Sequence, residues 1–218
     1  MKFDKNNLLL YAVTDRSWLA GEELSVPVEQ ALMGGITMLQ FREKKLTGEA
    51  LIREARALQK LCRAYGVPFV INDNVELAAR LDADGVHVGQ QDMQARQARS
   101  ILGSEKIIGV SAHSVEEALR AEADGADYLG AGAVFGTGTK SDAGTLDHAV
   151  LREICSAVNI PVVAIGGIGC SNIGELKGTG ISGVAVVSAI FGARDIKSSV
   201  ARLRALAKET AGGMEVLS

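Results

Sequence analysis

Short apolar runs alternate with segments of helical periodicity along the whole chain, and this alternation predicts the fold class. The apolar runs have the length of buried strands, whereas the segments between them repeat apolar residues every three to four positions. The expected strands cover residues 8–13, 36–41, 69–71, 85–88, 106–110, 127–130, 162–165 and 183–187. The expected helices cover 26–33, 75–81, 93–102, 146–157 and 196–208, and three more are capped by Thr47, Ser114 and Ser171.

Strands that alternate with helices pair in parallel, and eight such units predict a single α/β domain, a (β/α)8 TIM barrel over residues 1–218. Pro68 and Pro161 open the third and seventh expected strands, half a barrel apart. The alternative is an open doubly wound sheet, which carries Gly-x-Gly-x-x-Gly after its first strand. The chain has Thr14-Asp-Arg-Ser at that point, which favours the barrel.

Composition narrows the function classes. The chain is 47% hydrophobic and 22% charged, as in ordinary soluble proteins. A net charge of -3 gives no basic footprint for nucleic acid, and no apolar run reaches the length of a membrane span. Three widely spaced cysteines and a start without an export signal predict a cytoplasmic protein without a disulfide framework. The oligomeric state stays open, a homo-oligomer included.

A barrel places its active site at the C-terminal ends of the strands, so the residues after each strand are expected to form one ring. Nearly every expected strand is followed by polar or glycine-rich residues. These are Gln40 and Arg42 to Lys44, Asn72 to Asn74, Asp92, Ser111 and His113, Thr137 to Lys140, Gly166 to Gly169, and Ser188.

The ends of the seventh and eighth strands predict a phosphate site. Barrels often bind phosphate between these two loops and the start of a short extra helix. Residues 165–169 read Ile-Gly-Gly-Ile-Gly and offer close backbone N–H groups, and Val187-Ser188 offers a helix start with its positive dipole end. The alternative is that these glycines only form a tight turn.

Two acids predict a metal site across the mouth of the barrel. Asp73 and Asp92 follow adjacent strands, and two such carboxylates repel each other unless a cation lies between them. Mg²⁺ takes one or two carboxylates together with phosphate oxygens and water. Arg42, Lys44 and Lys140 can reach the same anion. Each acid taken alone also fits a turn or a helix cap.

The loop over residues 130–145 contains five glycines, three threonines and Lys140, a composition suited to handling anions. A plain flexible connection is the alternative. None of the three histidines stands in a nucleophile–base pair: His87 is expected to be packed or hydrogen-bonded in its strand, and His148 to lie on the surface. These features together predict two phosphate-bearing ligands, one held by backbone groups and one by metal and cations.

The ordered motifs resemble the thiamine-phosphate synthase family over almost the whole chain. The motifs are Tyr11-x-x-Thr-Asp-Arg16, Leu39-Gln-Phe-Arg-Glu-Lys44, Ile71-Asn-Asp73, Gly85-Val-His-Val-Gly-Gln-Gln-Asp92, Gly109-Val-Ser-Ala-His-Ser114, Asp127-Tyr-Leu-Gly130, Val134-Phe135, Thr137-x-Thr-Lys140, Ile165-Gly-Gly-Ile168 and Val187-Ser188. The resemblance implies condensation of 4-amino-2-methyl-5-(hydroxymethyl)pyrimidine diphosphate with a thiazole monophosphate, through ionisation of the diphosphate.

The resemblance also implies roles for individual residues. The pyrimidine diphosphate would be bound by Gln40, Phe41, Arg42, Glu43, Lys44, Asn72, Ser111 and Lys140. The thiazole phosphate would be bound by Thr137, Gly138, Thr139, Gly167, Val187 and Ser188, and Mg²⁺ by Asp73 and Asp92. Arg42, Ser111 and Lys140 are the candidate catalytic residues.

The chain departs from the family pattern at Gly136 and Gly138, where bulkier residues are common, and at Phe41, where leucine is commoner. Three rival functions stay open. A thiazole tautomerase-like relative would carry histidine at Ala133 and lack the metal acids. A non-catalytic sensor of phosphate ligands would need the glycine loops only. A Schiff-base aldolase would need a lysine inside the barrel, which no strand offers.

Overall fold

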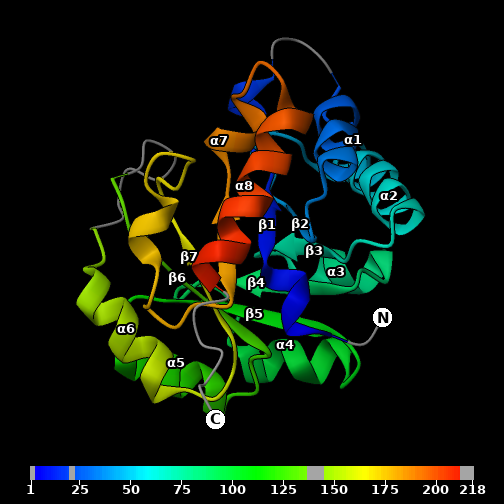
Figure 1. The fold of residues 1–218 in the computed structure, drawn as a ribbon. Coiled ribbons are helices and arrows are strands. Elements are labelled where there is room, and N and C mark those ends of the chain that lie inside the picture. Colours follow the sequence, from blue (N-terminus) through cyan, green and yellow to red (C-terminus); the bar gives the residue numbers. More distant parts are fainter. Residues whose placement is uncertain (1–2, 20–22, 137–144, 212–218) are drawn as a thin grey trace.

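The computed structural model describes residues 3–19, 23–136 and 145–211, and its centre is a closed barrel of eight parallel strands (Figure 1). Each strand pairs with its neighbours in sequence, and β1 pairs with β8 to close the ring. The strands are β1 (Leu10–Val13), β2 (Met38–Phe41), β3 (Phe69–Asn72), β4 (Gly85–Val88), β5 (Ile107–Ala112), β6 (Tyr128–Gly132), β7 (Val162–Ile165) and β8 (Gly183–Val186). The barrel predicted from the alternating pattern is confirmed.

Helices surround the barrel, as Figure 1 shows. The α-helices are α1 (Ser25–Gly34), α2 (Gly48–Ala64), α3 (Val75–Leu81), α4 (Ala95–Leu102), α5 (Val115–Ala123), α6 (His148–Ala157), α7 (Ser188–Phe191) and α8 (Ile196–Ala211). Among the described residues there are also three short 3-10 helices: η1 (Lys5–Leu8), η2 (Arg16–Trp18) and η3 (Ile173–Leu176). Within the described part of the chain, no helix is long and apolar enough to cross a membrane.

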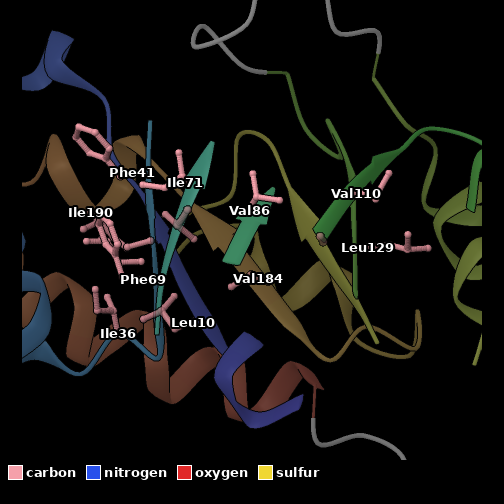
Figure 2. Close-up of a cluster of buried hydrophobic side chains, with 14 of the residues drawn as sticks. Leu10, Ile36, Phe41, Phe69, Ile71, Val86, Val110, Leu129, Val184 and Ile190 are labelled. Carbon is pink, nitrogen blue, oxygen red and sulfur yellow. The ribbon is translucent and has the colours of Figure 1, made fainter. Parts of the chain in front are cut away.

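Two separate cores follow from the alternation of side chains along the strands. In β2, Leu39 and Phe41 point outward into the large core between strands and helices, part of which is shown in Figure 2. Met38 points inward with Tyr11 and Tyr128, in a smaller core inside the barrel. Strand residues two apart therefore share a layer, and Gln40 shares the inner one with Met38.

The ends of helices and strands match the sequence prediction at some places and differ from it at others. The segment around Leu8, expected to be strand, is the end of η1, because an apolar residue can be buried equally well by a helical turn. The expected helix capped by Ser171 is η3, whose N-cap is Asn172. Ser114 caps α5 as predicted, but Glu117 accepts the N–H of His113 (2.7 Å) and so does not complete the box at Ser114.

The cysteines carry no disulfide. Cys62, Cys155 and Cys170 are all free. Burial raises the pKa of Cys62 to about 12 and that of Cys155 to about 11, so both thiols stay protonated near neutral pH. The prediction of idle thiols agrees with this arrangement.

Candidate active site

A cleft opens at the C-terminal ends of the strands. Its floor is apolar and comes from barrel strands, through residues such as Val13, Val163 and Ala185. Its walls contain most of the ring residues expected from sequence. Those are Gln40, Arg42, Lys44, Asn72, Asp73, Asp92, Ser111, His113, Gly166, Gly167, Val187 and Ser188.

Asp73 lies directly after β3 in a backbone conformation that non-glycine residues seldom adopt. Its φ is 61°, and its N–H donates to the carbonyl of His87 (2.8 Å), which ties the residue after β3 to the neighbouring strand β4. This conformation directs the carboxylate to Lys44, whose Nζ lies 2.8 Å from Oδ2. The helix cap is Asn74, which accepts the N–H of Leu77, so capping does not explain Asp73.

Asp92 reaches the same point from the loop after β4. Its Oδ2 accepts the N–H of Gly89 (2.8 Å), and the N-cap position of α4 belongs to Gln94, so Asp92 is not a helix cap either. Burial and then the nearby Asp73 carboxylate raise the pKa of Asp92. Burial also acts to raise the pKa of Asp73, but hydrogen bonds from Lys44 and Asp92 outweigh it and lower that pKa. The two carboxyl groups therefore lie close enough to shift each other's pKa, in opposite directions.

This acid pair suits Mg²⁺. Among the described residues there is no group of three histidine, cysteine, aspartate or glutamate side chains that could hold a metal ion. Zinc normally needs three or four protein ligands, whereas Mg²⁺ uses one or two carboxylates and takes the rest from phosphate and water. The donor set thus fits a cation that arrives together with a phosphorylated ligand.

The segment after β1 positions Arg42, the residue that follows β2. Thr14 exchanges two hydrogen bonds with the backbone of Arg42, 2.9 and 3.0 Å long, and Asp15 Oδ2 holds the Arg42 guanidinium at 3.1 Å. Both members of the Asp15–Arg42 ion pair are partly buried. The backbone and the side chain of Arg42 are therefore held before any ligand binds.

Two residues expected to contact the diphosphate have side chains directed elsewhere. Phe41 is 2% exposed and stacks on Phe69 in the outer core (6.1 Å between ring centroids), because it alternates with the inward-pointing Gln40. Glu43 pairs with Arg16 (2.6 Å) and accepts the backbone N–H groups of Lys45 and Leu46, and its side chain is 1% exposed. Glu43 thus shapes the turn that carries Lys44 and does not line the cleft.

The opposite wall is built from backbone. After β7, Gly166 and Gly167 adopt φ values of 103° and 66°. A Cβ at Gly166 would lie 2.4 Å from Ala133 Cβ, and one at Gly167 would lie 2.6 Å from the carbonyl oxygen of Gly136. Only glycine fits at these two positions, and the hydrogen bonds of the described residues leave the N–H groups of Gly167 and Ser188 unused.

The helix start expected at Val187-Ser188 is present, and it belongs to a very short helix. α7 contains only Ser188–Phe191, four residues, and no side chain caps it. So short a helix has a small macrodipole, because the dipole sums over aligned peptide units. The predicted phosphate site at this wall therefore has individual N–H groups to offer and little helix dipole.

The structure agrees with the expectation for His87 and differs from it at His148. His87 is buried, with Nδ1 3.0 Å from Tyr128 Oη and Nε2 3.0 Å from Ser111 Oγ. His113 is exposed and lies 3.0 Å from the Glu117 carboxylate. His148, expected on the surface, is half-buried and packs edge-on against Phe135.

The predicted residues Thr137, Gly138, Thr139 and Lys140 lie outside the described residues. Other residues also contribute to the cleft or its support and were given no role from sequence. Tyr11 lines the floor, Asp15 holds Arg42, and Gln90 donates from Nε2 to the carbonyl of Ser111 (2.6 Å). Tyr11 and Asp15 belong to the first motif of the chain and lie close to the end of β1. That position near a strand end could have indicated that both residues lie at the cleft.

Comparison with known proteins finds similarity to one enzyme family. The family model described as thiamine monophosphate synthase matches residues 10–190. The chain is 45% identical to the thiamine-phosphate synthase of Clostridium tetani, over 89% of this chain and 93% of that protein. It is 49% identical to the enzyme of that name from Desulfitobacterium hafniense, over 85% of this chain and 90% of that protein.

Solved structures agree. Thiamine phosphate pyrophosphorylase from Pyrococcus furiosus superimposes with a TM-score of 0.87 at 42% identity, covering 94% of this chain and 98% of that chain. A protein of the same name from Bacteroides thetaiotaomicron shares the fold at 19% identity, with a TM-score of 0.68 and 95% and 98% coverage. The match over residues 10–190 and the high identities show that the chain is an enzyme of the thiamine monophosphate synthase family.

Proposed function

We propose that this enzyme joins 4-amino-2-methyl-5-(hydroxymethyl)pyrimidine diphosphate to 4-methyl-5-(2-phosphoethyl)thiazole, giving thiamine phosphate and pyrophosphate. The observation that carries the proposal is the division of one cleft into two anion-binding walls. One wall has Arg42, Lys44 and the Asp73–Asp92 pair, and the other has the glycine N–H groups after β7 and the start of α7. The reaction requires one diphosphate and one monophosphate ligand side by side.

In the proposed reaction, the bond between the pyrimidine methylene carbon and the diphosphate oxygen breaks, and its electron pair leaves with the diphosphate. The thiazole nitrogen then forms the new bond to that carbon with its own lone pair. No proton has to move, so the reaction needs no general base, and the Ser111–His87 contact in the cleft (3.0 Å) is not required to act as a nucleophile and base. The apolar floor of Val13, Val163 and Ala185 suits two flat rings and keeps water from the carbon.

Charge stabilisation is the main task of the side chains. Arg42, held by Asp15, and Lys44 would bind oxygens of the diphosphate, and Ser111 would donate a hydrogen bond to it. Asp73 and Asp92 would hold Mg²⁺, which when bound neutralises charge on the leaving diphosphate. Gln40, Asn72 and Lys140 would complete this half. Residues 1–218 would act as one catalytic domain.

The monophosphate would bind at the backbone wall through Gly167, Val187 and Ser188, with Thr137, Gly138 and Thr139 as the predicted contacts from the loop after β6. Ala133 lines the cleft beside this wall, at the position where a tautomerase-like relative would carry histidine. A methyl group there supplies no proton transfer, which favours the synthase over that rival.

A single assay tests the proposal. Purified enzyme is mixed with both substrates and Mg²⁺, and thiamine phosphate and pyrophosphate are quantified, with each substrate omitted in turn. We expect equimolar products only in the complete mixture. Tight binding of the thiazole phosphate without any product would contradict the synthase and leave a sensor of phosphate ligands.

A further inference from the structure

A chain of buried hydrogen bonds crosses the interior of the barrel and connects two residues that line the cleft. Gln40 Nε2 donates to Tyr11 Oη (2.7 Å), and Tyr11 Oη lies 2.8 Å from Tyr128 Oη. Tyr128 Oη lies 3.0 Å from His87 Nδ1, and His87 Nε2 lies 3.0 Å from Ser111 Oγ. The five residues come from β2, β1, β6, β4 and β5, and both Gln40 and Ser111 line the cleft.

The strands leave space for this chain at one glycine in particular. A Cβ at Gly109 would lie 2.1 Å from Tyr128 Cζ and 2.5 Å from His87 Nδ1. The backbone of Gly109 does not have a positive φ, so the absence of a side chain, and not the conformation, is what the position requires. Phe3 stacks on the Tyr128 ring from the other end of the barrel (6.0 Å between centroids).

The order of protons along this chain can be assigned. Burial raises the pKa of Tyr11 and of Tyr128 above the usual value of a phenol, so each hydroxyl keeps one proton. The Gln40 amide nitrogen can only donate. Tyr11 accepts that bond and is left with one proton for Tyr128, and Tyr128 then has one proton for His87 Nδ1. His87 must carry its own proton on Nε2 and donate it to Ser111 Oγ.

The opposite order satisfies fewer groups. If Tyr128 donated to Tyr11, the Tyr11 hydroxyl would receive two bonds and its own proton would lose the only hydroxyl partner it has among the described residues. Tyr11 is 1% exposed, so an unmade hydrogen bond there is costly. The order that starts at Gln40 and ends at Ser111 leaves no inner proton unused.

We propose that Tyr11, Tyr128 and His87 are positioning residues that fix the Ser111 hydroxyl as a hydrogen-bond donor toward the cleft. Because Ser111 Oγ accepts from His87, its single proton points to the ligand. A serine so arranged selects an acceptor, such as a phosphate oxygen, and disfavours a donor. This deepens the role of Ser111 and rests on the proposed function only for the identity of the anion.

The tautomer of His87 tests the proposal without any activity. Two-bond ¹H–¹⁵N correlation spectra of the ligand-free enzyme, labelled in its histidine rings, distinguish Nε2–H from Nδ1–H imidazole. His113→Gln and His148→Gln remove the other two ring signals and assign His87. We expect a single Nε2–H tautomer whose Nδ1 accepts a hydrogen bond. An Nδ1–H ring, a mixture or an imidazolium would overturn the proposal.

Gln40→Glu tests which group donates in each hydrogen bond between Gln40 and Ser111. At alkaline pH an ionised carboxylate can only accept, so Tyr11 must donate to it and every later bond reverses. We expect the Nδ1–H tautomer of His87 to appear in this variant, and an unchanged ring would contradict the assigned order. Tyr65→Phe, which alters an exposed tyrosine at the end of α2, should leave the spectrum unchanged.

A kinetic cycle tests whether Tyr128 acts through Ser111. Tyr128→Phe keeps the ring on Phe3 and removes the hydroxyl. We expect kcat/KM to fall about fivefold, the usual effect of one hydrogen bond, but less than about twofold when Ser111 is already alanine. Equal losses in both backgrounds would assign Tyr128 to packing alone and contradict the proposal. If no variant makes thiamine phosphate, the proposed function fails, while the tautomer of His87 still decides the proton order.

Discussion

The two walls of the cleft offer different kinds of groups to the anions that we propose they bind. The wall after β2, β3 and β4 uses charged side chains that hold one another: Asp15 with Arg42, and Lys44 with Asp73 beside Asp92. The wall after β7 and β8 uses backbone N–H groups exposed by glycines. Charged side chains can follow a ligand whose charge changes as a bond breaks, whereas a backbone cradle holds a phosphate that stays intact. The difference matches a diphosphate that leaves and a monophosphate that remains.

The largest effect is expected from the acid pair. Asp92→Ala removes half of the proposed Mg²⁺ site, so Mg²⁺-dependent turnover should fall about 100-fold or more, the size seen when one stabilising group is lost from a charged transition state. Binding of the thiazole phosphate, followed by calorimetry, should stay nearly the same because it uses the other wall. Equal losses in turnover and in thiazole phosphate binding would remove the metal assignment. Asp124→Ala, at an exposed ion pair with Arg96 outside the main cleft, is the control.

A smaller effect, on the other ligand, is expected from a substitution in the backbone wall. Gly167→Ala requires a positive φ and places a Cβ 2.6 Å from the Gly136 carbonyl, so the cradle must distort. We expect thiazole phosphate binding to weaken about tenfold or more, corresponding to the strain of a left-handed non-glycine residue. Binding of the diphosphate should hardly change. Gly169→Ala is a matched control, since its Cβ would meet Ala189 Cβ at an ordinary 3.7 Å.

A third, moderate effect is expected when the ion pair that holds Arg42 is weakened. Asp15→Asn keeps an acceptor for Ser17 but removes the charge beside Arg42, so the guanidinium is held less firmly. KM for the pyrimidine diphosphate should rise about fivefold, as for the loss of one charge-assisted bond, with little change in KM for the thiazole phosphate. Steady-state kinetics with each substrate varied separately measures both values. A rise confined to the thiazole phosphate would show that Asp15 does not act through Arg42.

The smallest effect on either ligand is expected at Phe41. Its side chain stacks on Phe69 in the outer core, away from both walls. Phe41→Leu should lower the free energy of unfolding by about 1 kcal/mol, as for a conservative change of core volume, and leave both KM values unchanged. Denaturant unfolding and kinetics measure the two quantities. A selective change in diphosphate KM would show that the position contributes to that site after all.

The sequence predicted the side-chain wall better than the backbone wall. The sequence could place Asp73, Asp92 and Arg42 together because parallel strands of a barrel end at one face. The charge of each side chain is known from its residue type, and its position follows from the strand end that precedes it. The outward direction of Phe41 follows from alternation with Gln40 and was overlooked. The φ values of Gly166 and Gly167, the four-residue length of α7 and the 3-10 form of residues 173–176 depend on tertiary contacts that no local pattern encodes.

The hydrogen-bonded chain inside the barrel was even less accessible from sequence. Its members come from five strands, and only the register of the closed barrel brings Tyr11 beside Tyr128. The glycine that admits them, Gly109, has an ordinary position in an expected strand. A buried polar group inside an apolar strand was the one available signal, and His87 was correctly expected to be packed or hydrogen-bonded.

Simultaneous binding tests the central claim most directly. Mg²⁺-pyrophosphate is titrated by calorimetry into the enzyme alone and into the enzyme saturated with thiazole phosphate. Two separate walls predict that both titrations give the same stoichiometry and nearly the same dissociation constant. Competition, seen as an apparent dissociation constant that rises in proportion to the thiazole phosphate concentration, would show that both anions use one site and would contradict the account.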